Sequence, residues 1–237
     1  MEKPLILPSD YQRIKRVQSF EELLSTPLDH GINALCWERS LEGDFNEIST
    51  NIGPIEEITT IEDSDLNSLD LSPEGKIARS QLITDQNLLR KAGLSPILDS
   101  IPAYPQDSNQ TPFPTDVYSY HADSATIQAD TYLCSYNIAC SEGLRNEDAV
   151  KRVDIPETRA HLLDLYGGKD DDGFKTYLKE HFYDLHYLPA QGSSPFAFGF
   201  GNLWRIATEY PNSPVPPCVH RAPKTSPGAL PRLLLIS

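Results

Sequence analysis

Residues 116–138, DVYSYHADSATIQADTYLCSYNI, carry the pattern that decides the fold of this chain. The two ends of this stretch, 116–122 and 130–138, are rich in tyrosine and other residues that favour strands, and the segment between them is polar and turn-forming. Further strand-like runs follow at 196–208 (FAFGFGNLWRIAT), 217–221 (PCVHR) and 231–237 (PRLLLIS). Several short strands separated by turn signals predict an antiparallel sandwich or barrel.

The residues before this region have a more helical pattern. Residues 9–25 follow a helical period, and residues 31–38 (GINALCWE) predict a buried strand. Residues 72–100 predict one or two helices, because Ser72-Pro73 is a typical helix start and Gly93 a typical helix end.

Together these patterns predict a single domain of the α+β class, mainly β with helices. We expect residues 1–114 to form a helix-rich covering region and residues 115–237 to form the β core, with a helical insert at about 140–195. The helices of the insert are expected at about 155–183, since Ile155-Pro156 is a typical helix start. The place of the insert in the sequence makes it a candidate lid over a site in the core.

The chain is strongly acidic: its 237 residues carry a formal net charge of −14, and its pI is about 4.7. Such a surface repels phosphate backbones, so nucleic acid is not an expected partner. The sequence shows no basic amphipathic run, no signal-peptide pattern, and no apolar stretch of the roughly 20 residues that a membrane span needs. We therefore expect a cytoplasmic protein with no membrane partner, whose four cysteines are reduced core residues.

Two histidines and an aspartate form the main candidate site. His121 and Asp123 lie two residues apart at the end of a predicted strand, so their side chains point to the same face. His220 lies on another predicted strand, and two histidines with one carboxylate are typical of non-haem iron(II) oxygenases. A His-x-acid pair alone occurs about once by chance in such a chain. Alternative metal ligands are His186 and the pair Cys218-x-His220.

An arginine follows the second histidine a short way along the sequence. Arg232 lies twelve residues after His220, in the apolar run PRLLLIS. An arginine that faces into such a strand needs an anionic partner, because a buried unpaired guanidinium is costly. Arginine binds a carboxylate through two parallel hydrogen bonds.

The set His121-Ala122-Asp123, His220 and Arg232 resembles the iron(II)/2-oxoglutarate-dependent dioxygenase superfamily, over about residues 115–237. The resemblance implies a double-stranded β-helix (jelly-roll) core, iron(II) held by the two histidines and the aspartate, and Arg232 on the distal carboxylate of 2-oxoglutarate. It also implies an oxygenase of the hydroxylase type, which uses molecular oxygen and acts on a small molecule or a peptide side chain. Many members carry Arg-x-Ser, whereas this chain has Leu234 at that position.

Several neighbouring residues are further candidates for binding the co-substrate. Strand alternation puts Tyr132, Cys134 and Tyr136 on one face, and either tyrosine can donate to 2-oxoglutarate or serve as an ordinary strand aromatic. Asn137, on the other face, is a weaker candidate. Two alternative functions stay open: a jelly-roll metal enzyme that does not use 2-oxoglutarate, and a non-enzymatic binding module whose His-x-Asp is coincidental.

Overall fold

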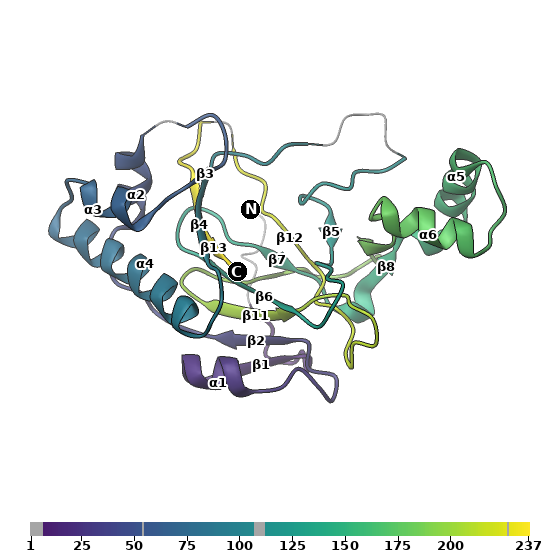
Figure 1. Cartoon of the computed structure of the whole chain (residues 1–237), viewed down its shortest axis with the longest axis horizontal. Helices are drawn as coiled ribbons and strands as arrows, with labels where there is room; N and C mark the ends of the chain where they lie inside the picture. The colour runs from purple at the N-terminus through teal and green to yellow at the C-terminus, as the bar shows by residue number, and fades with distance from the viewer. Residues whose placement is uncertain (1–6, 54, 107–111, 227) are drawn as a thin grey trace.

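The computed structural model describes residues 7–53, 55–106, 112–226 and 228–237, and within them the chain forms two β-sheets and six α-helices (Figure 1). The seven-stranded sheet has the order β1-β2-β11-β6-β13-β4-β3, and the six-stranded sheet has the order β10-β7-β12-β5-β9-β8. The strands are β1 (Ile14–Val17), β2 (Ala34–Trp37), β3 (Thr59–Thr60), β4 (Ile97–Ile101), β5 (Tyr120–His121), β6 (Asp130–Ser135), β7 (Glu142–Gly143), β8 (Ala149–Lys151), β9 (His186–Pro189), β10 (Phe196–Ala197), β11 (Leu203–Ala207), β12 (His220–Arg221) and β13 (Arg232–Ile236).

The strands pair antiparallel throughout, except that β1 and β2 are parallel. From β4 onward the chain passes repeatedly between the sheets: β4, β6, β11 and β13 belong to the larger sheet, whereas β5, the four strands β7 to β10, and β12 belong to the smaller one. The predicted α+β class is confirmed, but the described residues mix helices and strands and are not mainly β. Within the described residues, no helix is long and apolar enough to cross a bilayer.

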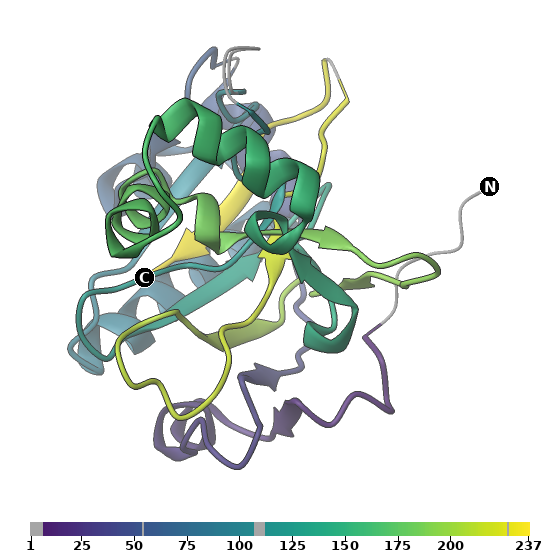
Figure 2. The same cartoon turned by 90° about the vertical axis from the view of Figure 1, so that its right-hand side faces the viewer.

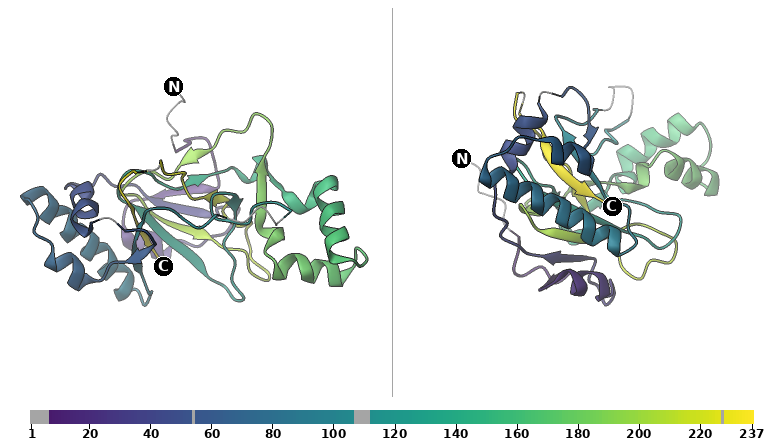
Figure 3. Two further views of the ribbon diagram at one scale, coloured as in Figure 1. Left: turned by 90° about the horizontal axis from the view of Figure 1, so that it is seen from above. Right: turned by 60° about the vertical axis from the view of Figure 1, so that its left-hand side comes forward.

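Two groups of helices, α2 to α4 and α5 with α6, lie at opposite ends of the molecule (Figures 1 and 3), and α1 lies beside β1 (Figure 1). The N-terminal group contacts the outer face of the larger sheet, and the other group lies beside β8 and β9 (Figure 2). The helices are α1 (Phe20–Ser25), α2 (Phe45–Ile52), α3 (Asp63–Ser68), α4 (Pro73–Lys91), α5 (Pro156–Tyr166) and α6 (Asp172–Glu180), joined by the short 3₁₀ turns η1 (Asn146–Asp148), η2 (Arg152–Asp154) and η3 (Tyr183–Leu185).

The longest helix, α4, begins and ends as its sequence predicts. The Ser72 side chain accepts a hydrogen bond from the amide of Gly75, Pro73 occupies the first turn, and Gly93 follows the helix with a φ of 82°. Ala78, Leu82 and Leu89 are buried against the larger sheet, so packing rather than propensity holds the helix there.

The space between the sheets is filled mainly by aromatic and aliphatic side chains. Trp204 is almost completely buried, stacks on Phe198 with ring centroids 4.2 Å apart, and donates its indole N–H to the Phe198 carbonyl. The ring of Phe196 lies over Gly143, where any side chain would overlap it. This inter-sheet core places the inward faces of both sheets against each other.

Two sequence expectations for the N-terminal region are wrong. Residues 14–17, expected in a helix, form β1, and the helix α1 begins only at Phe20. Residues 97–100, expected in a helix, form β4 together with Ile101. Long-range pairing explains both, since β1 lies beside β2, and β4 pairs with β13 along its whole length. The region 1–114 therefore does more than cover the core, because it supplies four strands of the larger sheet.

The helical insert is partly confirmed. Both α5 and α6 lie within residues 155–183, as expected, and they share a small hydrophobic core that includes Leu162 and Phe174. The wider segment 140–195 also contains β7, β8 and β9, so it extends the smaller sheet as well.

A buried ion pair joins α4 to the larger sheet. Arg39 donates two hydrogen bonds to the carboxylate of Asp85, at 2.7 and 2.9 Å, and the side chain of Asp85 is fully buried. The hydroxyl of Tyr136 donates to the same carboxylate at 2.7 Å. Such a pair is costly to break, because removing one partner leaves a buried charge without compensation.

We predict that Asp85→Asn lowers the free energy of unfolding by about 2–4 kcal/mol, since Arg39 then stays buried without a counter-ion. The matched control is Asp63→Asn, because Asp63 also accepts two hydrogen bonds from an arginine, Arg90, but on the surface. That control is expected to cost less than about 1 kcal/mol. Urea unfolding of the three proteins measures both values, and equal losses would contradict the assignment.

Candidate metal centre

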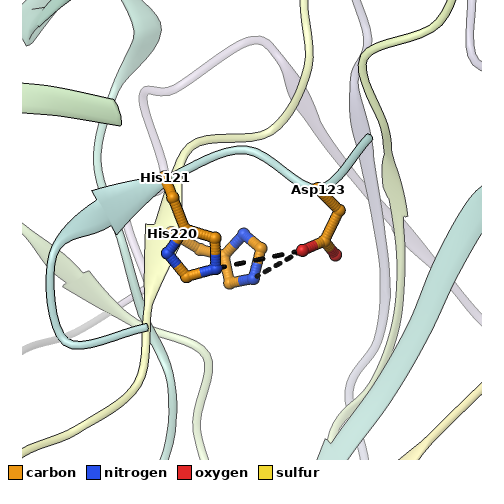
Figure 4. A group of neighbouring side chains, drawn as sticks. All are labelled: His121, Asp123 and His220. Atoms are coloured by element: carbon orange, nitrogen blue, oxygen red, sulfur yellow. Dashed lines mark ion pairs between the residues drawn. The ribbon is translucent and has the colours of Figure 1, made fainter. Parts of the chain in front are cut away.

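The two histidines of the predicted site are cross-strand neighbours. In the antiparallel pairing of β12 with β5, His220 lies directly opposite His121, and their ring centroids are 4.7 Å apart. Asp123 follows β5 by two residues and turns its carboxylate towards both rings (Figure 4). The structure therefore brings together the three residues that the sequence singled out.

The donor atoms of this group converge on one point. The Nε2 atoms of His121 and His220 each lie 3.9 Å from Oδ1 of Asp123, and the three ligand atoms are all within 4.8 Å of one another. An ion with ligand distances of about 2.1 Å needs neighbouring donors roughly 3.0–3.4 Å apart. Each histidine nitrogen would thus have to approach the Asp123 oxygen by about 0.5–0.9 Å, and no pair of ligand atoms would have to close by more than about 1.8 Å, which side-chain rotations provide.

Hydrogen bonds to the backbone hold each ring in a metal-binding orientation. Nδ1 of His121 lies 2.8 Å from the Ser119 carbonyl, and Nδ1 of His220 lies 3.3 Å from the Cys218 carbonyl. A carbonyl only accepts, so each Nδ1 carries the proton and each Nε2 presents its lone pair to the centre. Such partners are typical of metal-ligating histidines.

The carboxylate is held in a similar way. Thr131, on β6, donates its hydroxyl to Oδ2 of Asp123 at 2.6 Å, which leaves Oδ1 directed at the histidines. Thr131 belongs to the larger sheet, so this hydrogen bond ties the site to the opposite wall of the inter-sheet space.

The protonation states also suit a cation. Burial, together with the neighbouring charge of His220, lowers the pKa of His121 to about 4, so this ring is neutral at pH 7. Burial acts to raise the pKa of Asp123, but the attraction of His220 and the Thr131 hydrogen bond outweigh it and hold that pKa below its usual value. A neutral imidazole and an ionised carboxylate are the forms that bind metal ions.

Arg232 lies in the inter-sheet space and is 1% exposed. Its Nη2 donates to the hydroxyls of Ser135 and Ser141, at 2.8 Å each, and its Nη1 donates to the hydroxyl of Tyr104 at 3.4 Å. No carboxylate lies within ion-pairing distance of it in the part of the chain that the structure describes. Burial lowers the pKa of its guanidinium, which nonetheless stays charged.

The position of Ser141 relates Arg232 to the histidines. Gly143, on β7, is the register partner of His220, and Ser141 lies two residues before it on the same side of the chain. Two residues along a strand span about 7 Å. Arg232 thus reaches across from the larger sheet to a point near His121, Asp123 and His220, hereafter the His–Asp–His group.

The structure corrects the placement of the two tyrosines. Tyr132 and Tyr136 share a face, as expected, but that face of β6 packs against the N-terminal helices and points away from the inter-sheet space. Tyr136 donates to Asp85, and the guanidinium of Arg205 lies 6.0 Å from the centre of the Tyr132 ring. Neither tyrosine is therefore placed to bind a co-substrate at the metal group.

Other candidates also have structural partners. Asn137 donates to Ser49 and the Pro231 carbonyl, and accepts from the amide of Leu233. His186 is the other register partner of His121 and is buried, with ring centroids 5.9 Å apart, but it is not one of the three converging ligands. Cys218 packs in the inter-sheet core and contributes its backbone carbonyl to His220.

Four residues near the site have no signal in the sequence. Thr131, Ser135 and Ser141 are ordinary polar residues of strands and loops. Tyr104 lies in a segment rich in proline, residues 101–115. Their roles depend on pairing between strands far apart in the chain, which a single sequence does not reveal.

Comparison with known proteins gives no match: no family model fits the chain, and no curated protein or solved structure is significantly similar to it. The chemistry of the site therefore has to be argued from its own side chains. Those side chains are two imidazoles, one carboxylate and, nearby, one buried guanidinium.

We predict that the protein binds one divalent ion of the iron–cobalt–zinc series, and that His121→Ala or Asp123→Ala weakens this binding at least about 100-fold. Loss of the supporting hydroxyl in Thr131→Val is expected to weaken it about tenfold. The control is His186→Gln, which keeps the wild-type affinity. Cobalt(II) titration followed by visible absorption measures these values, and an equal loss in His186→Gln would contradict the ligand set.

The stability of the metal-free protein is expected to depend on His121. Because its folded pKa of about 4 lies below the ordinary value of 6.5, the unfolded chain binds the extra proton first as the pH falls. The contribution of neutral His121 to the free energy of unfolding is therefore fully present above about pH 6.5. As the pH falls from 6.5 to 4, the free energy of unfolding decreases by on the order of 3 kcal/mol. His121→Asn should flatten this part of the profile in urea unfolding, and an unchanged slope would contradict the burial argument.

Proposed function

We propose that this chain is an iron(II)- and 2-oxoglutarate-dependent oxygenase of the hydroxylase type. The observation that carries the proposal is the buried guanidinium of Arg232, which has no carboxylate partner among the described residues and faces the same inter-sheet space as the His–Asp–His group. A metal site and an anion site so close together favour a ligand that spans both.

The strand order supports a double-stranded β-helix (jelly-roll) as the core of this enzyme. Eight strands, taken in chain order, would form it. They alternate between the sheets except that the fourth and fifth both belong to the smaller sheet, an order that fits two interleaved Greek keys. The additional strands extend the sheets at their edges. The eight core strands would be β4, β5, β6, β7, β10, β11, β12 and β13.

The donor set suits iron(II) in this role. Two imidazoles and one carboxylate on one side of an ion leave its other positions for a co-substrate and oxygen. When bound, iron(II) supplies the activation of oxygen, in which 2-oxoglutarate yields succinate and carbon dioxide and a substrate C–H becomes C–OH. The chain's own part is to hold His121, Asp123 and His220 in register and to keep His121 neutral.

Arg232 would bind the carboxylate of 2-oxoglutarate that lies farthest from the metal. Two buried arginines lie on opposite faces of the larger sheet, and their environments differ. Arg39, on the side of the helices, is neutralised by Asp85, whereas Arg232 meets only hydroxyl groups. A buried charge without a counter-ion costs several kcal/mol, so an anionic ligand at Arg232 would be strongly favoured.

Many members of the superfamily carry a serine two residues after the arginine, where this chain has Leu234. A serine on the neighbouring strand would replace it. Leu234 packs in the inter-sheet core, and its register partner on β6 is Ser135, whose hydroxyl contacts Arg232. A hydroxyl beside the guanidinium is therefore supplied by the neighbouring strand instead of by the residue two positions after the arginine.

One observation favours the alternative of a metal enzyme that does not use 2-oxoglutarate. Arg232 is covered almost completely, and its hydrogen bonds to Ser135 and Ser141 join the two sheets. On this alternative the arginine is a structural link, and its replacement affects stability without affecting co-substrate affinity. Measured co-substrate affinity separates the two functions, and the absence of metal binding would favour a non-enzymatic binding module instead.

We predict that anaerobic addition of iron(II) and 2-oxoglutarate produces a weak visible absorption band, and that Arg232→Gln raises the dissociation constant of 2-oxoglutarate at least about 30-fold. The control is Arg205→Gln, because Arg205 is also largely buried and ion-paired, but lies on the face of the helices. It should lower stability and leave co-substrate affinity unchanged. No band in the folded, iron-loaded wild type would refute the proposal.

A further inference from the structure

A groove of two adjoining cavities opens beside His121. The smaller cavity, of about 180 Å³, is lined by His121, and the larger, of about 560 Å³, extends away from it. The two cavities share Ser124, Phe182 and Leu185 as lining residues, so they lie side by side. A concave, partly apolar space next to a candidate catalytic group is the usual setting of a substrate site.

Three segments form the walls, and backbone hydrogen bonds tie them to the metal-ligand segment. The amide of Glu209 donates to the Asp123 carbonyl at 2.7 Å, and the amide of Ala125 donates to the Glu209 carbonyl at 2.9 Å. The amide of Ala122 donates to the Leu185 carbonyl at 3.0 Å. The segments 124–126, 182–185 and 209–211 are therefore fixed relative to His121 and Asp123.

Phe182 has an unusual conformation at the mouth of this groove. It follows α6 with φ 59° and ψ 14°, the left-handed conformation in which glycine is usual after a helix, and its side chain is 58% exposed. A bulky residue in this conformation is strained, and an exposed phenyl ring contributes little to folding. The strain costs stability and the exposed ring recovers little of it, which points to a role for this ring outside the fold.

The charges of the larger cavity are mainly negative. Asp184 and Glu209 are half-buried, and neither forms an ion pair within the described ranges 7–53, 55–106, 112–226 and 228–237. Both carboxylates belong to residues that line the larger cavity. Lys179, which is exposed, is the one basic residue among those that line the cavity.

We propose that this groove binds the primary substrate, and that the substrate is a small amine with an apolar body against Phe182 and Leu185 and its cationic group beside Asp184 and Glu209. The inference rests on the proposed function, because it takes the His–Asp–His group as the reactive centre. It adds the substrate class and assigns Phe182 as the residue that anchors the apolar part. A half-buried pair of carboxylates favours a cation there and opposes an anion.

The charge preference is tested with three probes of similar shape: 4-phenylbutylamine, 4-phenylbutanol and 4-phenylbutyrate. Isothermal titration calorimetry is carried out on the full chain without metal or 2-oxoglutarate, at pH 7.5. We expect the amine to bind at least tenfold more tightly than the acid, with the alcohol between them. Equal binding of the amine and the acid would overturn the proposed substrate class.

Variants of the carboxylates test the same point by residue. Glu209→Gln and Asp184→Asn are each expected to weaken binding of the amine three- to tenfold and to leave binding of the alcohol unchanged. Glu157→Gln, a change of the same kind in the first turn of α5, is the control and should alter neither. An unchanged ratio of amine to alcohol in both groove variants would refute the role of the carboxylates.

Phe182→Gly tests the anchoring role, because it has opposite effects on stability and on binding. Relief of the backbone strain raises stability, whereas loss of the ring weakens binding of the probe. The melting temperature should stay equal or rise, while binding of 4-phenylbutanol weakens at least fivefold. His30→Gly is the matched control, since His30 also has a left-handed conformation (φ 48°) on another surface, and it should leave probe binding unchanged. Wild-type binding in Phe182→Gly, or loss of both stability and binding, would overturn the anchoring role.

These measurements are independent of the proposed function, because the probes bind without metal or co-substrate. Amine binding in a protein that fails to bind 2-oxoglutarate would leave the groove assignment intact and refute the oxygenase. Normal binding of iron(II) and 2-oxoglutarate without any amine preference would refute the groove assignment alone.

Discussion

The pairing of two very short strands is the constraint on which the site depends. Each of β5 and β12 has only two residues, and their register sets His121 opposite His220. A slip by one residue would turn one histidine to the outer face, where Tyr120 and Val219 lie. Two-residue strands do not hold a register alone, so neighbouring strands must do it. The smaller sheet provides this, because β7 pairs with β12 on one side and β9 pairs with β5 on the other.

The larger sheet has a different function on each face. On the outer face it carries the hydrophobic core under the N-terminal helices, together with the neutralised pair of Arg39 and Asp85. On the inner face it presents Thr131 to the aspartate of the site and Arg232 to the space between the sheets. This division explains why alternate residues of β6 differ so much in role: Thr131 and Ser135 serve the inner face, whereas Tyr136 supports the helices.

Most strands of the C-terminal half, and the pair His121 and Asp123, can be predicted from the sequence because they depend on local patterns. The approach of His220 to that pair depends on pairing between distant strands. Strand alternation is enough to place His121 and Asp123 on one side, and the short runs of strand-forming residues mark most of the core strands. The pattern cannot reveal which face of a strand meets which layer. For this reason Tyr132 and Tyr136 were expected at the site and are found under the helices. It also cannot reveal partners such as Ser141, which reaches Arg232 only through pairing between distant segments.

The central claim is that His121, Asp123 and His220 hold one metal ion. Anomalous X-ray scattering from crystals soaked in cobalt(II), recorded on both sides of the cobalt absorption edge, tests this claim most directly. One strong peak is expected within about 2.3 Å of Nε2 of both histidines and Oδ1 of Asp123. A peak elsewhere in the molecule, or none at this position in fully soaked crystals, would contradict it.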